Sequence, residues 1–288
     1  QSTTGENKPT TLAAKHVVIS SGVVGTLDLL MRNRDQYCTL PGVSHTLGAV
    51  VRTNSEAITG VLHPPGVDMT VGTGVSSDFY PDANTHVTQN RFDRGYRIIR
   101  YLYGPMTDGD RPGLRSLKTC LAILLSPALM LKNWFCRDWE KRVTFFTAMQ
   151  DLDNSLGFTF ARDWRRGFRK GLKSVANPAT QPPTYLKDAN DVTRTYAELA
   201  GGTPMSSITE SIGNRSTTAH ILGGCPMGAD ASTAVIDSNH EVHGHPGLFV
   251  VDGSSIPANI GVNPSLTITA MAERFASLQP DNARDDAQ

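Results

Sequence analysis

Short apolar runs separated by turn residues dominate this chain, and their spacing changes along it. Residues 15–22 contain a short apolar run typical of a buried strand, and residues 23–34 carry leucines at helical spacing, so together they predict half of a βαβ unit. From residue 70 onward the runs are β-prone and lack helical crossovers, which predicts an antiparallel sheet. The strand candidates are residues 70–75, 85–88, 96–101, 143–149 and 156–160.

Residues 117–135 are strongly apolar, with an interruption at Pro127. Each apolar run is too short to cross a bilayer. Two interpretations fit: a pair of core helices, or a hydrophobic lid that admits a lipid-like substrate and makes transient contact with a membrane surface. The basic residues that flank the runs are Arg115, Lys118, Lys132 and Arg137.

The pair Asn263-Pro264 marks the start of a predicted helix. Asn is a favoured N-cap, Pro is favoured at the first helical position, and residues 265–276 continue with apolar residues at helical spacing. The first-turn N–H groups of such a helix have no intrahelical acceptor, and the positive end of its dipole stabilises negative charge. A ligand beyond Asn263 would therefore meet a site that favours an anion.

His220 and Asn263 are the strongest candidates for chemistry. Histidine is suited to moving a proton near neutral pH, and an amide can hold a hydroxyl group without titrating. Oxidising an alcohol requires a base for the proton and an acceptor for the hydride, and because no side chain accepts hydride a cofactor is implied. Convergence of His220, Asn263 and the N-terminus of the 265–276 helix would suit alcohol oxidation by a flavin. The alternative is a core histidine beside an ordinary helix cap.

Three motifs carry a specific resemblance to a known family. They are His-Ile-Leu-Gly-Gly-Cys at 220–225, Asp-Gly-Ser-Ser-Ile-Pro at 252–257 and Gly-Val-Asn-Pro at 261–264. The block resembles the C-terminal signature of the glucose-methanol-choline (GMC) flavin oxidoreductases, in their cholesterol-oxidase-like branch, with Ile221 in place of the usual proline. The resemblance implies FAD as cofactor, a sterol or other bulky alcohol (most simply a 3β-hydroxysteroid) as substrate, and oxygen or another electron acceptor.

The resemblance also implies roles for particular residues. His220 would contact the substrate hydroxyl and Asn263 would lie over the flavin ring. The family's cholesterol oxidases use a glutamate to move the steroid double bond; Glu140, just before a predicted strand, is its nearest counterpart, with Asp151 and Asp153 as alternatives. A surface ion pair and a β-turn are the plainer interpretations of these carboxylates. The implied cofactor-binding residues are Gly22, Asp252, Gly253, Asn263, Pro264 and Ser265.

Pattern and resemblance together predict an α/β (α+β) chain with a partial FAD-binding Rossmann-like domain and an antiparallel-sheet substrate domain. Residues 1–60 would be a late part of the FAD domain, residues 61–215 the substrate domain with an apolar helical insert, and residues 216–288 the segment that returns to the FAD domain. The sequence contains no Gly-x-Gly-x-x-Gly fingerprint, so we expect the C-terminal part of a longer enzyme. The alternatives are a GMC dehydrogenase for another bulky alcohol, or a non-catalytic fragment without FAD.

Composition limits the setting and the partners. The formal net charge is zero, which argues against nucleic acid as a partner. The cysteines show no C-x-x-C spacing, so reduced thiols and a cytoplasmic location are expected. Three histidines between residues 240 and 245 suggest a metal site, but a Gly/Pro-rich turn without cysteine argues against one. The run Arg-Thr-Asn-Ser-Glu at 52–56 is interpreted as a polar turn without chemistry.

Overall fold

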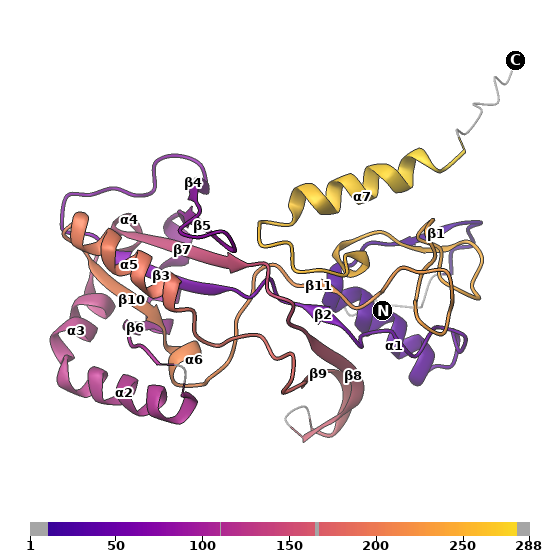
Figure 1. Ribbon diagram of the computed structural model, residues 1–288, viewed down its shortest axis with the longest axis horizontal. Coiled ribbons are helices and arrows are strands. Elements are labelled where there is room, and N and C mark those ends of the chain that lie inside the picture. The colour runs from indigo at the N-terminus through magenta and orange to yellow at the C-terminus, as the bar shows by residue number, and fades with distance from the viewer. Residues whose placement is uncertain (1–10, 110, 165–166, 281–288) are drawn as a thin grey trace, which may run out of the picture.

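The computed structural model describes residues 11–280 apart from 110, 165 and 166. It combines helices with two antiparallel sheets and one parallel pair of strands (Figure 1). The six-stranded sheet has the order β4 (Val75–Phe79), β5 (Thr85–Asn90), β7 (Val143–Gln150), β3 (Ala57–Leu62), β10 (Thr203–Ser207) and β6 (Tyr103–Pro105). The four-stranded sheet has the order β11 (Leu222–Gly223), β2 (Val51–Arg52), β8 (Leu156–Asp163) and β9 (Arg169–Ala176).

The helices lie between and around these sheets. Short elements border the strands: η1 (Arg94–Leu102), α4 (Trp139–Arg142), α6 (Ile208–Ser211) and η3 (Gly253–Ser255). The longer helices are α1 (Gly22–Asp35), α2 (Pro112–Leu125), α3 (Pro127–Phe135), α5 (Lys187–Leu199) and α7 (Ser265–Ser277). In Figure 1, α2 and α3 lie at one end of the molecule and α1 at the other, while α7 runs along one edge.

Strand β7 forms the centre of the large sheet, and every one of its residues is buried. Because successive side chains of a strand point to opposite faces, Phe146 and Ala148 pack in the core under α5, whereas Val143 and Phe145 pack with Trp139 on the other face. Because both faces are buried, the apolar residues of this strand do not alternate regularly with polar ones.

The early and late parts of the chain meet in a parallel strand pair. Strand β1 (Val17–Ile19) lies beside β12 (Leu248–Val250). Helix α1 follows β1 and contributes the fully buried Leu27 and Leu30 to the adjoining core. The helix begins at Gly22, whose φ of +69° lies in the left-handed region that favours glycine.

The sequence predicted several of these elements, and it missed others for identifiable reasons. The predicted first strand and helix, and the strands at 85–88, 143–149 and 156–160, are confirmed by β1, α1, β5, β7 and β8. The predicted strand at 96–101 is wrong, because these residues form the 3₁₀ helix η1. The run 70–75 lies before β4, which starts at Val75. Strand β3 is not among the predicted strands, since a central strand buried on both faces shows no alternation.

Candidate active site

The side chains of His220 and Asn263 meet. His220 lies in the loop before β11, Asn263 lies in the loop before α7, and Asn263 Nδ2 is 3.3 Å from His220 Nε2. The imidazole is 18% exposed, so a molecule approaching from outside can reach it. The meeting of these two groups at one point, which the motifs predicted, is observed.

The other nitrogen of the imidazole contacts a buried carboxylate. His220 Nδ1 is hydrogen-bonded to Oε1 of Glu56, and Glu56 Oε2 accepts the backbone N–H of Ala219 at 2.6 Å. The Glu56 side chain is 0% exposed and lies directly before β3. A carboxylate on Nδ1 selects the tautomer that carries its proton there, so Nε2 keeps a lone pair that faces Asn263.

Asn54 fixes the loop that leads to Asn263. Its Oδ1 accepts the N–H of Gly261 at 2.8 Å, its Nδ2 donates to the carbonyl of Val262 at 2.8 Å, and its own N–H donates to Asn259 Oδ1 at 3.0 Å. The residue is completely buried and has a φ of +59°, a region that Asn tolerates better than most side chains. The position of the Asn263 amide is therefore tied to the segment before β3.

The run at 52–56 does form a turn at Asn54 and Ser55, as predicted, but its Glu56 contacts His220, so the run lies within the candidate site. Arg52 adds a third tie, donating from Nε to the carbonyl of Pro257 and from Nη1 to that of Asn154, each at 2.9 Å. The available signal was a polar run directly before the apolar residues 57–62. Only the fold shows that the carboxylate at its end contacts a histidine 164 positions later.

Helix α7 begins beside this group without a side-chain cap. The helix starts at Ser265 with Pro264 as its N-cap, one residue later than the sequence predicted. The first N–H bonded back along the helix is that of Ile268, which donates to the carbonyl of Pro264 at 2.9 Å. The N–H groups of the preceding turn therefore lack intrahelical acceptors, and with the helix dipole they favour an anionic group next to Asn263.

The remaining predicted cofactor contacts lie below α7 and at the start of α1. Asp252 Oδ2 accepts a hydrogen bond from Thr26 at 2.6 Å, and its Oδ1 accepts the N–H and O–H of Ser254 at 2.8 and 2.6 Å. Asp252 thus connects α1 to η3, because one of its carboxylate oxygens is hydrogen-bonded to each element. Gly253 is buried in the same turn, whereas a Cβ at Gly22 would meet nothing within 4 Å. Contacts of these residues with FAD stay predictions.

Glu140 is not brought to the His220 pair. It lies in α4, where Nε and Nη2 of Arg97 donate to its carboxylate at 3.0 and 2.6 Å and lower its pKa. The register of β7 on β3 pairs Val143 with Leu62 and Ala148 with Ala57. Glu140 lies just before the Val143–Leu62 pair, whereas the site lies beside the Ala148–Ala57 pair. These two pairs are five positions apart, which is roughly 17 Å along the strand.

The two alternative carboxylates lie nearer to the site. The Cβ of Asp151 would be 3.1 Å from a Cβ built on Gly261, in the loop that carries Asn263. Asp153 forms an ion pair with Arg52 at 2.5 Å, and its side chain is 91% exposed. Asp151 therefore helps to shape the Asn263 loop, and Asp153 holds Arg52 from outside.

The histidines between 240 and 245 serve local structure. His240 is fully buried, and its Nδ1 lies 3.0 Å from the carbonyl of Val250. The Nε2 of His243 lies 3.0 Å from the carbonyl of Gly228. Within residues 11–280, apart from the three not described, no group of three or more His, Cys, Asp or Glu is arranged to hold a metal ion.

A second buried carboxyl group lies on the segment that leads to the site histidine. Glu210 of α6 is 3% exposed and accepts hydrogen bonds from Thr217 Oγ1 and from the backbone N–H of Ile58. Burial raises the pKa of Glu210 to about 7, and the negative charge of Glu56 acts in the same direction, although Thr217 and Arg115 favour the ionised form. No sequence pattern marked this group, because it lies in a helix of only four residues.

Glu210→Gln is expected to change how stability depends on pH. Since the pKa of Glu210 is raised from 4.5 to about 7 on folding, its contribution to stability is fully present below pH 4.5 and is lost as pH rises through about 7. The unfolding free energy of the variant relative to the parent should therefore rise between pH 5 and pH 8, by about 3 kcal/mol at most. Urea titrations at several pH values measure this, with the exposed Glu198→Gln as control. Parallel pH curves for parent and Glu210→Gln would contradict it.

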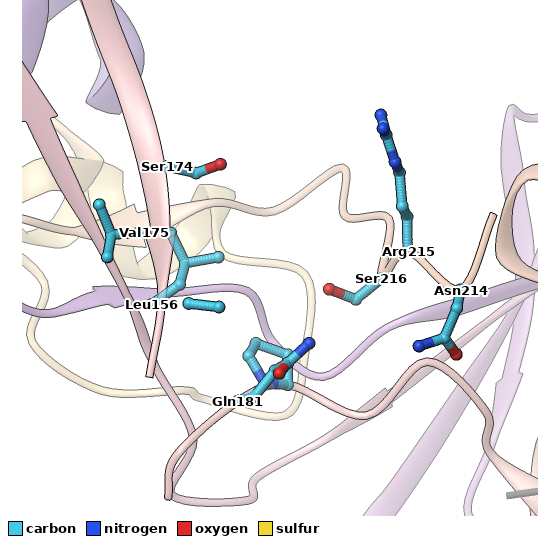
Figure 2. Close-up of a pocket in the computed structure, with 9 residues that line it drawn as sticks. Leu156, Ser174, Val175, Gln181, Asn214, Arg215 and Ser216 are labelled. Carbon is cyan, nitrogen blue, oxygen red and sulfur yellow. The ribbon is translucent and has the colours of Figure 1, made fainter. Parts of the chain in front are cut away.

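A pocket of about 350 Å³ opens beside the same segment (Figure 2). Leu156 and Val175 of the β8–β9 hairpin line one side, and Asn214, Arg215 and Ser216 line the other. Its volume falls in the range of small-molecule pockets, and its lining mixes apolar and polar side chains. One stretch of chain therefore forms a pocket wall and, four residues later, carries His220.

Residues 137–272 match the GMC oxidoreductase family. The chain belongs to this family. It is 37% identical over 283 residues to a cholesterol oxidase of Mycobacterium tuberculosis and 35% identical over 271 residues to one of Acinetobacter baumannii. These matches cover 96% and 94% of this chain but only 48% of each relative. The chain therefore spans about half the length of the curated relatives it matches.

Two further proteins match the chain more distantly. A long-chain-alcohol oxidase of Arabidopsis thaliana is 30% identical over 156 residues, 51% of this chain and 20% of that protein. The crystal structure of pyridoxine 4-oxidase from Mesorbium loti superposes with a TM-score of 0.53 at 18% identity, over 91% of this chain and 50% of that one. The predicted family and the predicted mixed helix-and-sheet fold are confirmed.

Proposed function

We propose that this chain forms the substrate side and the catalytic pair of an FAD-dependent GMC enzyme that oxidises a secondary alcohol, a 3β-hydroxysteroid, with oxygen as electron acceptor. The observation that carries the proposal is the arrangement Glu56–His220–Asn263. In it Nδ1 of the imidazole is hydrogen-bonded to the Glu56 carboxylate, and Nε2 faces the Asn263 amide. Similarity to two cholesterol oxidases supports a sterol as the substrate.

The protonation chemistry follows from this arrangement. Glu56 accepts the Nδ1 proton, so Nε2 of His220 takes the hydroxyl proton of the alcohol, and the buried carboxylate stabilises the imidazolium that forms. Asn263 Nδ2, which lies 3.3 Å from Nε2, donates to the substrate oxygen and orients the hydroxyl. When bound, FAD would supply the acceptor for the hydride of the carbinol carbon; with oxygen as the final electron acceptor, the products would be a ketone and hydrogen peroxide.

The residues beside this pair fit the flavin end of FAD. The uncapped first turn of α7 offers N–H donors and a positive dipole end to the negative charge that a flavin gains on reduction. Gly253 and Pro264 are buried beneath that helix start and bring backbone close to it. We assign these groups and Ser265 to the flavin, and Gly22 at the start of α1 to the nucleotide part.

The β1–β12 pair supports a larger FAD-binding unit around this chain. Parallel strands are normally covered on both faces. Val17 and Val18 of β1 are nevertheless 49% and 48% exposed, and Val24 of α1 is 52% exposed. These apolar side chains suit packing against further nucleotide-binding elements, and no Gly-x-Gly-x-x-Gly fingerprint occurs in the sequence itself.

A flavin titration tests the proposal. The protein is incubated with FAD, freed of unbound cofactor, and its visible spectrum recorded before and after anaerobic addition of cholesterol, with the 3α-hydroxy epimer as control. We expect retained flavin absorption that cholesterol bleaches and the epimer does not, followed by hydrogen peroxide release in air.

Other outcomes of the titration separate the rival functions. Anaerobic bleaching without peroxide in air would show a dehydrogenase that uses another acceptor. Bleaching by bulky non-steroid alcohols alone would remove the steroid assignment. Retained flavin that neither cholesterol nor any other alcohol bleaches would refute the proposal.

A further inference from the structure

Helix α2 carries its apolar face outward. Leucines recur along it at helical spacing, as expected for the buried side of an amphipathic helix. The side packed against the protein instead includes Arg115, which is 2% exposed, and Thr119, which is fully buried and hydrogen-bonded to Thr107. The exposed leucines of α2 are Leu114 (48%), Leu117 (55%), Leu121 (46%), Leu124 (74%) and Leu125 (80%).

The apolar surface continues onto α3. Leu131 is 53% exposed and Phe135 is 73% exposed. In Figure 1 the two helices lie together at the end of the molecule farthest from α1 and β1. Among the described residues, no single helix is long and apolar enough to cross a membrane; the helices Gly113–Leu125 and Pro127–Phe135 meet the length and composition limits only together, and they are bent by 80°. This geometry suits helices that lie along a surface.

The charge of this segment is one-sided. Residues 111–137 contain five basic residues and no acidic residue, although the whole chain has a formal net charge of zero. Arg115 is buried and faces Glu210, Asp108 and Tyr185 within the protein. The exposed cations of the segment are Arg111, Lys118, Lys132 and Arg137.

We propose that α2 and α3 dock onto an anionic lipid bilayer, with the exposed leucines and Phe135 in the headgroup–acyl boundary and the flanking cations among the lipid headgroups. An apolar helical face bordered by Lys and Arg without acidic residues is complementary to a negatively charged lipid surface. A protein partner would need acidic groups opposite all four cations, whereas an anionic bilayer offers them at any spacing.

One segment links this docking surface to the candidate active site. Ser116 of α2 donates to the carbonyl of Ile212 at 2.9 Å, directly after α6. Helix α6 carries Glu210, which is hydrogen-bonded to Thr217 on the segment that leads to His220. A lipid-bound α2 would therefore contact the start of the segment that carries the imidazole. The docking itself does not depend on the proposed reaction.

Vesicle flotation tests the proposal. The 288-residue protein is mixed with vesicles of phosphatidylcholine alone or with about 30% phosphatidylserine, and the floated fraction is measured. The stripe variant, Leu121→Gln/Leu124→Gln/Leu125→Gln, removes three of the five exposed leucines of α2. The charge variant, Lys118→Gln/Lys132→Gln, removes two of the four exposed cations. Leu199→Gln, which alters an 85% exposed leucine of α5, is the matched control. Far-UV circular dichroism checks the fold of each variant.

We expect the parent and the Leu199→Gln control to float with the anionic vesicles. The stripe variant should lose about tenfold or more of its partitioning, and the charge variant should lose binding to the anionic vesicles in particular. A parent that does not float, or a stripe variant that floats as well as the parent, would overturn the proposal. So would light scattering that shows a dimer abolished by the stripe substitutions without any vesicle binding, because the surface would then serve self-association.

Discussion

Replacing His220 by glutamine is expected to lower the turnover of the alcohol by about 10²-fold or more while leaving bound flavin in place. Glutamine can still donate a hydrogen bond to Glu56, which avoids leaving a fully buried carboxylate without a partner. It carries no group that accepts a proton near neutral pH, so the alcohol must lose its hydroxyl proton without a base. Steady-state rates with cholesterol and the flavin spectrum of each protein measure the two effects.

His243→Gln is the matched control for this substitution. His243 is also partly buried and also has one ring nitrogen beside a hydrogen-bond acceptor, but that acceptor is the carbonyl of Gly228, 3.0 Å from Nε2, and not a group of the site. We expect turnover of this variant to match the parent. Full turnover in His220→Gln would remove the imidazole from the reaction, and loss of flavin would show that His220 supports the cofactor instead.

The sequence was sufficient to predict those residues of the site that lie in short, recognisable motifs. Gly223 and Gly224 follow His220 closely, Gly261 and Pro264 stand around Asn263, and the backbone requirements of these residues leave a pattern in the sequence. Helix α7 follows its predicted start within one residue. The juxtaposition of the two side chains depends on one antiparallel pairing, β11 on β2, and on the ties of Asn54 to residues 259–262. No local pattern encodes those pairings.

The missed elements share a physical cause. Strand β3 is buried on both faces, so its sequence lacks the alternation that marks a half-exposed strand. Without that strand, Glu56 had no predicted position, whereas Glu140 preceded a strand that was easily found. The register of β3 on β7 places Glu56 at the candidate site and Glu140 at the far end of the strand pair. The glutamate of the site is therefore Glu56 and not the predicted Glu140.

Replacing Glu56 by glutamine should lower kcat by about 10²-fold or more with little change in KM. The carboxylate side chain is completely buried and acts through the imidazole, so substrate binding in the ground state does not depend on it. A neutral amide on Nδ1 permits the wrong tautomer and no longer stabilises the imidazolium that forms when the hydroxyl proton is taken. Steady-state kinetics on flavin-loaded protein separate kcat from KM.

Two further variants distinguish this role from a purely structural one. Glu56→Asp keeps the negative charge on a shorter side chain, and it should recover part of the kcat lost in Glu56→Gln if the charge on the imidazole is what matters. Glu140→Gln makes the same chemical change on a buried glutamate that pairs with Arg97, and it should leave oxidation of the hydroxyl unchanged. If instead Glu56→Gln and Glu56→Asp lose kcat equally, or if the loss appears only in KM, Glu56 serves the shape of the loop rather than the proton transfer at His220.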